Sequence, residues 1–122
     1  MPEFTFEFDQ PAKLLNLNDR LHWAAKARLV KEWREGVGWE AIRIRPQLPQ
    51  IPLPPAAIAV EFPVRTKARH DRDNAVATVK PLTDSLVDVG ILTDDSDEWV
   101  TAIHTSFRHT KTDTKVKVTL TW

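Results

Sequence analysis

Hydrophobic and polar residues alternate in three stretches of the chain, and a period of two is typical of half-buried β-strands. The apolar positions of these stretches are Phe4, Phe6 and Phe8, then Ile58, Val60 and Phe62, and finally Val116, Val118, Leu120 and Trp122. A further strand is expected over residues 98–108, separated from the last one by a polar turn at residues 109–114. The pattern therefore predicts four strands.

Between the first two strands the hydrophobic period changes to one of three and four residues, which indicates the buried stripe of a helix. The stripe is formed by Trp23, Ala27, Val30, Trp33 and Val37. Asn18 or Asp19 can cap the start of this helix, and Gly36 and Gly38 mark its expected end. The segment that follows, residues 46–55, contains five prolines and is expected to be an extended connection rather than a helix.

A second helix is expected before Gly90, and Pro81 leaves its start open. If the helix begins near Ala75, Pro81 lies inside it and kinks the chain. If Thr78 caps the helix, Pro81 falls in the first turn, where proline is tolerated. The second alternative is slightly favoured. The apolar side of this helix is formed by Val79, Leu82, Leu86 and Val89.

The order of the expected elements, β-α-β-α-β-β, predicts a mixed α/β (α+β) fold with helices packed on a mixed sheet. The last two strands are expected to form an antiparallel hairpin at the edge of that sheet. At 122 residues the chain has the length of a single domain, spanning residues 1–122. No apolar run is long enough for a membrane span and no signal peptide is evident, so a cytoplasmic protein is expected.

Charge is balanced overall, with 17 basic and 17 acidic residues, which by itself argues against a nucleic-acid-binding protein. The charges are segregated, however: residues 81–100 carry six acids and no base, whereas residues 13–45, 65–80 and 101–122 are each net basic. Such blocks are commonly solvated faces. The alternative is an acidic cation site framed by a basic surface that binds an anion.

The chemically capable residues lie between positions 70 and 95. Asp71 and Asp73 are two residues apart after a strand, so in extended chain their carboxylates would point the same way. Asp94 and Asp95 follow the second helix, and Lys80 lies between the two acidic pairs. Without cysteine, such a site would be rich in oxygen and would suit Mg²⁺ or Mn²⁺.

Each of these residues also has a structural explanation. Asp73 or Asn74 can cap a helix, and Asp94 and Asp95 can belong to an ordinary turn. Lys80 and Asp84 stand four residues apart and can form a surface ion pair. The spacing of these residues therefore leaves a metal site and a structural role both open.

Taken together, these motifs resemble the RusA family of Holliday-junction resolvases. The family pattern has Asp-x-Asp-Asn, then a lysine four residues ahead of Asp-x-Leu, a glycine, and an Asp-Asp pair before a strand. The matching residues in this chain are Asp71, Asp73 and Asn74, then Lys80, Asp84 and Leu86, then Gly90, Asp94 and Asp95. Residues 18–23 are similar to the Asn-Arg-x-x-Trp-like segment near the family's N-terminus, so the resemblance covers most of residues 16–108.

The resemblance implies a Mg²⁺-dependent endodeoxyribonuclease, with Mn²⁺ as a substitute, that acts as a homodimer on four-way DNA junctions. It implies that Asp71, Asp73 and Asp95 are metal ligands, that Asp94 assists them and that Lys80 is the catalytic lysine. The residues expected to contact DNA are Arg20, Arg65, Lys67, Arg69, Arg72 and Asn74. The interval from Asn74 to Lys80 is about three residues longer than in the shorter members, so the placement of Lys80 depends on the local backbone.

Two other functions remain open at this point. The chain can be a branched-DNA-binding module without activity, in which the acids are caps and turns. It can also be a metal-dependent nuclease that acts on RNA or on ordinary duplex.

Overall fold

The computed structural model describes residues 2–15 and 23–122, without the side chains of residues 69–71. The elements are β1 (Glu3–Asp9), α1 (Trp23–Ile44), the short 3₁₀ helix η1 (Arg45–Gln47), β2 (Ala56–Val64), α2 (Arg69–Asp88), β3 (Val100–His109) and β4 (Lys115–Thr121). The predicted mixed α/β class and the β-α-β-α-β-β order are confirmed.

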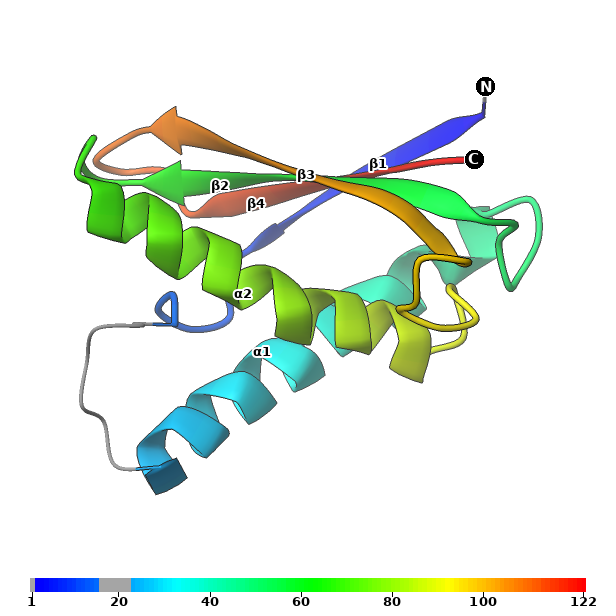
Figure 1. Ribbon diagram of the computed structural model, residues 1–122, viewed down its shortest axis with the longest axis horizontal. Coiled ribbons are helices and arrows are strands. Elements are labelled where there is room, and N and C mark those ends of the chain that lie inside the picture. Colours follow the sequence, from blue (N-terminus) through cyan, green and yellow to red (C-terminus); the bar gives the residue numbers. More distant parts are fainter. Residues whose placement is uncertain (1, 16–22) are drawn as a thin grey trace.

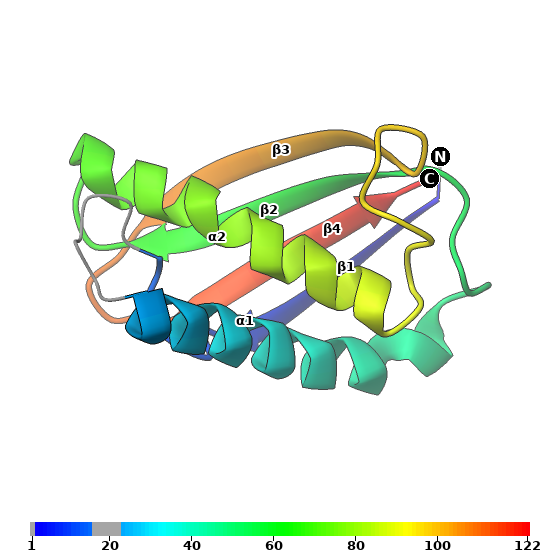
Figure 2. The same cartoon turned by 60° about the horizontal axis from the view of Figure 1, so that its bottom comes forward.

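The two long helices lie side by side against one face of a four-stranded sheet (Figures 1 and 2). The strand order is β1-β4-β2-β3. The β2–β3 pair is parallel and the other two neighbouring pairs are antiparallel. Strands β1, β2 and β3 therefore all run in one direction, and their carboxyl ends meet at the same edge of the sheet.

The predicted hairpin of the last two strands is wrong, because β2 lies between β3 and β4. Helix α2 returns the chain so that β3 pairs with β2 in parallel, and β4 then enters the sheet between β1 and β2. Its alternating residues Val116, Val118 and Leu120 are completely buried there. A strand with so strong an apolar face buries more surface when it has a neighbour on each side than at an edge.

A single hydrophobic cluster joins the sheet to both helices. At its centre the Trp33 ring of α1 meets the Phe62 ring of β2 edge to face, with ring centroids 6.4 Å apart. Leu82 and Leu86 of α2 pack into the same cluster and are 0% exposed. Phe6 and Phe8 of β1 are also buried, as their alternation with polar residues predicts.

The buried stripe of α1 differs from the prediction. Trp33 and Val37 are buried, but Trp23 is 76% exposed, and the remaining buried positions are Leu29, Ala41 and Ile44. The helix also does not end at the two glycines, since it continues to Ile44. The predicted caps Asn18 and Asp19 lie outside the described residues.

Both predicted starts of the second helix are wrong, because α2 begins at Arg69 and Pro81 lies well inside it. An interior proline costs about 3 kcal/mol through its missing N–H and its ring clash. Burial of Leu82 and Leu86 outweighs this cost, since each buried leucine contributes about 1.5–3 kcal/mol. The Ser85 hydroxyl lies 3.0 Å from the carbonyl oxygen of Pro81 and 2.8 Å from that of Arg34, and so links α2 to α1.

The proline-rich connection is extended only in part. Its first residues form η1, in which Pro46 occupies the first turn, where no N–H is needed. Further along, Leu53 is buried and its N–H donates to the carbonyl oxygen of Ile91 at 2.9 Å. The connection is therefore fixed against the segment that follows α2.

The two helical glycines of α1 give opposite expectations for substitution. A Cβ at Gly36 would lie 2.4 Å from Pro11 Cβ, whereas at Gly38 the nearest atom, Val89 Cγ1, is 3.9 Å away. Gly38→Ala should therefore raise the free energy of unfolding by about 0.5–1 kcal/mol. Gly36→Ala should lower it by about 1–3 kcal/mol, because the close approach of Pro11 to α1 is lost. Urea denaturation measures both, and an equal stabilisation by the two changes would contradict this packing.

Candidate functional site

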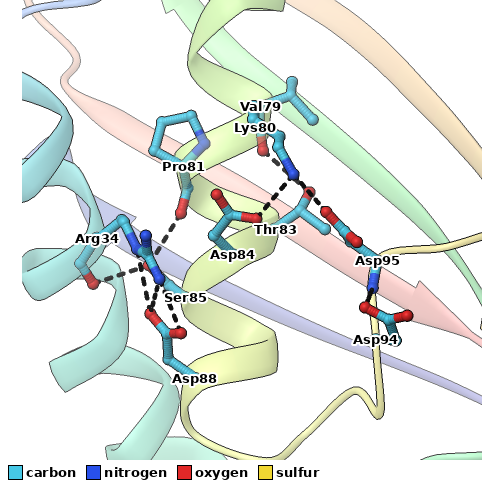
Figure 3. A network of polar contacts seen from close by, with 10 residues as sticks. All are labelled: Arg34, Val79, Lys80, Pro81, Thr83, Asp84, Ser85, Asp88, Asp94 and Asp95. Carbon is cyan, nitrogen blue, oxygen red and sulfur yellow. Dashed lines mark hydrogen bonds and ion pairs between the residues drawn. The ribbon is translucent and has the colours of Figure 1, made fainter.

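The Lys80 ammonium lies between two carboxylates (Figure 3). Its Nζ donates to Asp84 Oδ1 at 3.1 Å and also forms an ion pair with Asp95 Oδ2. The Lys80 side chain is 67% exposed, so the arrangement is open to solvent. We refer to Lys80, Asp84 and Asp95 as the lysine–carboxylate cluster.

Two elements position this cluster. Lys80 and Asp84 are one helical turn apart on α2 and so share a face. Asp95 comes from the loop before β3, which starts with a reversal at Gly90, whose φ of +81° suits glycine. Asp94 Oδ1 accepts the N–H of Asp95 at 2.8 Å and so shapes the turn. The predicted turn is therefore present, and it also directs Asp95 toward Lys80 (Figure 3).

Lys80 and its partners change one another's ionisation. The hydrogen bond to Asp95, followed by that to Asp84, raises the pKa of Lys80. The hydrogen bond from Lys80 is the main cause that lowers the pKa of Asp95. Lys80 is therefore a cation at neutral pH, which suits it to offset negative charge and not to act as a general base.

The pKa of Asp95 provides a test of this geometry. Lys80→Met should raise the pKa of Asp95 toward its ordinary value, measured by carbon NMR titration of the carboxyl groups. The stabilisation from the lowered pKa of Asp95 is present above the unfolded value of about 3.9 and is lost as the pH falls through the folded pKa. The stabilisation from the raised pKa of Lys80 is present below the unfolded pKa of about 10.4 and is lost as the pH rises through the folded pKa.

The matched control for this titration is Lys31→Met. Lys31 also pairs with a carboxylate four residues ahead, Glu35, and both side chains are exposed on α1. This change should leave the pKa of Asp95 where it is in the wild-type protein. An unchanged Asp95 pKa in Lys80→Met would contradict the ion pair between Lys80 and Asp95.

A groove of about 380 Å³ adjoins the cluster, between α2 and β3. Lys80 and Asp95 line it together with Val76 and Ile103, each of which is 53% exposed. Strand β3 is at the edge of the sheet, so the groove lies beside an edge strand. Exposed apolar side chains beside a fixed cation are typical of a surface that receives a ligand.

The expected convergence of Asp71 and Asp73 rests on extended chain, and this premise is wrong. Both residues belong to the first two turns of α2, so the backbone that carries them is helical and not extended. Asp73 and Lys80 are seven residues apart, which is close to two whole turns. They therefore share a face of α2, about 10 Å apart along its axis.

Among the described residues, no three acidic or histidine side chains are close enough to hold a metal ion together. Asp95 belongs to the lysine–carboxylate cluster and Asp94 precedes it in the chain, whereas Asp73 lies toward the start of α2 and the side chain of Asp71 is not described. The donor set of these four residues consists of carboxylate oxygens only, which is the chemistry that Mg²⁺ and Mn²⁺ prefer.

The predicted DNA contacts gather around the start of α2. Arg65 and Lys67 are exposed in the loop after β2, Arg72 is exposed in the first turn, and Asn74 is half-buried one residue after Asp73. An Arg65 Nη1–H donates to the carbonyl oxygen of Lys111. Arg20 and the side chain of Arg69 lie outside the described residues.

Asp84 is the residue of the cluster that the sequence analysis leaves without a chemical role. Its i,i+4 spacing to Lys80 was the available signal, and that spacing alone is equally typical of a surface pair. In the structure the Asp84 side chain is 24% exposed and bonds the lysine from the side opposite Asp95 (Figure 3). Asp84 therefore orients Lys80 toward the groove.

The chain matches no protein-family model and no curated protein. Within the described residues, no helix is both long enough and apolar enough to cross a membrane.

Proposed function

We propose that this protein is a Mg²⁺-dependent endodeoxyribonuclease that cuts branched DNA, as its resemblance to the RusA family implies. The observation that supports the proposal best is the Lys80 cation held by two carboxylates at an open groove. The turn at Asp94 and Asp95 carries one of these two carboxylates, and Asp73 is on the same face of α2 as Lys80. A cation, several carboxylates and an open surface are the parts that hydrolysis of a phosphodiester requires.

In this proposal Asp71, Asp73 and Asp95 would hold Mg²⁺, and Asp94 would assist by fixing the turn that carries Asp95. Binding would require Asp95 to leave Lys80 and approach Asp73, since no three described acidic side chains converge in this structure. Mn²⁺, which takes the same oxygen ligands, can substitute. Such a metal would supply a positive charge beside the phosphate and would lower the pKa of a water molecule bound to it. Without a cation, these carboxylates would repel both one another and DNA, so activity should depend strictly on the metal.

Lys80 offsets the negative charge that develops on the phosphate oxygens during cleavage. Like any lysine with a pKa that is not lowered, it is protonated throughout the neutral range, and its two carboxylate partners raise that pKa further. Asp84 would hold Lys80 in place if Asp95 turned away to bind Mg²⁺, because the bond from Lys80 Nζ to Asp84 does not involve Asp95. This division of roles makes Asp84 a positioning residue.

The basic residues around the start of α2 would bind DNA through its phosphates. Arg65, Lys67 and Arg72 are exposed on this part of the surface, and Arg20, Arg69 and Asn74 belong to the same proposed set. Phosphate contacts of this kind do not depend on base sequence, and they weaken as salt rises. Binding and cutting are therefore expected to be separable by mutation.

A homodimer completes the proposal. A four-way junction has approximate two-fold symmetry, so a two-fold dimer presents two equivalent sites to two like strands. Light scattering at micromolar protein is expected to give a dimer mass. A protein that acts on DNA inside a cell would work in the cytoplasm, which is the location that belongs to this proposal.

A substrate panel tests the function. Wild-type protein should cut a synthetic four-way junction with Mg²⁺ or Mn²⁺, should not cut with EDTA, and should cut linear duplex and RNA of the same sequence much less. Cutting of duplex or RNA in preference to the junction would favour a nuclease with another substrate. Binding of the junction without cutting under all metal conditions would favour a non-catalytic DNA-binding module.

A further inference from the structure

A second hollow, of about 490 Å³, lies at the carboxyl ends of β1, β2 and β3. It is lined by residues that follow each of these strands: Gln10 after β1, Arg65 after β2 and Thr110 after β3. Lys13, from the segment between β1 and α1, completes the wall. In sheets with parallel strands, ligands characteristically bind outside the carboxyl ends of the strands. We call this hollow the strand-end pocket.

The segment that carries Lys13 is held in place by polar groups of both helices. The indole N–H of Trp33, a side chain that is 0% exposed, donates to the carbonyl oxygen of Lys13 at 2.8 Å. The buried hydroxyl of Thr78 accepts the N–H of Leu15 at 3.1 Å and donates to the carbonyl oxygen of Asn74 at 2.8 Å. Two core side chains thus fix the backbone on either side of Leu14, so the exposed Lys13 side chain lines the pocket from a rigid support.

The charge of the strand-end pocket is positive. Lys13 and Arg65 supply two cations, and the one acidic residue in its lining, Asp113, already has other partners. Asp113 Oδ1 accepts the N–H of Lys115 at 2.8 Å and Oδ2 accepts Arg108 Nη2–H at 2.9 Å. These interactions, with the backbone bond first, lower the pKa of Asp113 and keep it an anion committed to those donors.

Hydrogen-bond donors with fixed positions accompany the two cations. A guanidinium has five N–H groups, so the bond from Arg65 Nη1 to the carbonyl oxygen of Lys111 orients the guanidinium and leaves other N–H groups able to donate. Thr110 Oγ1 accepts the N–H of Asp113 at 3.1 Å and that of Thr112 at 3.3 Å. A hydroxyl that accepts two bonds still has its own proton to donate. Leu14 and Val64 add apolar wall beside these groups.

We propose that the strand-end pocket binds one nucleotide unit, with Lys13, Arg65 and Thr110 contacting its phosphate and the apolar wall contacting its sugar or base. A volume of about 490 Å³ is in the range of small-molecule sites and exceeds what a phosphate alone fills. If the proposed function is right, the nucleotide belongs to a DNA strand that passes from the pocket to Asp73 along α2. The inference rests on the proposed function for this origin of the nucleotide and not for the binding itself.

The test is a backbone-amide NMR titration of the full chain without metal, at constant ionic strength, with thymidine 5′-monophosphate, thymidine or inorganic phosphate. The monophosphate should shift the amides of residues 13–15 and 65–66 and should bind about tenfold more tightly than either of the other two probes. Equal affinity for thymidine would overturn the phosphate contact. Equal affinity for inorganic phosphate would overturn the nucleotide-sized site.

Substitutions at exposed positions assign the contacts. Lys13→Met and Arg65→Met should each weaken monophosphate binding about tenfold, whereas Lys111→Met, an equal loss of charge outside the lining, should change it less than twofold. Equal losses in all three would overturn the pocket in favour of diffuse attraction. The titration measures binding and does not depend on cleavage. A protein that binds the monophosphate but, in a separate assay, cuts no junction therefore disproves the proposed function alone. A protein that cuts junctions, with binding unaffected by Lys13→Met, disproves the pocket alone.

Discussion

Replacing Lys80 with methionine is expected to lower the rate of junction cleavage by about 10²–10³-fold, because a preorganised cation at a developing negative charge contributes about 3–4 kcal/mol. Methionine keeps the length of the side chain and removes only its charge. The side chain is 67% exposed and outside the core, so the fold should persist. Single-turnover cleavage of a four-way junction at saturating protein measures this effect apart from binding.

Lys31→Met is the control for this result, since it removes the same charge from a comparable exposed ion pair on α1. Its cleavage rate at saturating protein should stay within twofold of wild type. Junction binding by Lys80→Met, measured with Ca²⁺ in place of Mg²⁺, should weaken far less than its cleavage rate. A Lys80→Met protein that cuts as fast as the Lys31→Met control would remove Lys80 from the mechanism.

Asp95→Asn is expected to reduce cleavage by about 100-fold or more, because a lost metal ligand removes several kcal/mol of charge stabilisation. Asparagine is nearly the same size and can still accept a bond from Lys80. The change removes one negative charge from a surface that faces DNA, so junction binding should be equal to or tighter than that of wild type. Cleavage and binding should therefore move in different directions.

Asp97→Asn is the matched control, two residues further along the same exposed loop. It removes the same charge without touching the lysine–carboxylate cluster. If both substitutions reduce cleavage equally, the effect belongs to the acidic loop as a whole and not to Asp95. If neither reduces it, Asp95 is not a metal ligand.

Strands could be predicted from this sequence where side chains alternate strictly. Phe6 and Phe8 of β1, or Val116 and Val118 of β4, are buried as the alternation requires. The position of β4 within the sheet could not be predicted in the same way. Whether β4 pairs with β3 or inserts between β1 and β2 depends on where α2 returns the chain, which the local pattern does not contain.

The helices show the limits of local rules more clearly. Pro81 and the glycines of α1 are ordinary signals for helix ends, yet both helices continue through them. Buried leucines compensate for Pro81, and Gly36 is in the helix interior because Pro11 packs against it. In each case a contact distant in sequence outweighs a preference that is worth about 1–3 kcal/mol.

The candidate site was predictable in part. The spacing of Lys80 and Asp84 allowed a surface ion pair, which the structure contains, whereas the ion pair between Lys80 and Asp95 could not be predicted from spacing. The expectation for Asp71 and Asp73 depended on extended backbone and fails because α2 begins before them. The role of Lys13 carries no sequence signal, since it follows from hydrogen bonds to Trp33 and Thr78 that only the folded chain provides.

The central claim is that acidic residues of α2 and of the loop before β3 form one metal-dependent active site, and Asp73→Asn tests it most directly. Among the proposed metal ligands with described side chains, Asp94 and Asp95 come from the loop before β3, and Asp73 is the one that belongs to α2. A four-way junction should be cut by the wild type with Mg²⁺ and left intact by Asp73→Asn, while both proteins bind it with similar affinity. Wild-type and mutant proteins that bind the junction equally and are equally inert with every metal would contradict the claim.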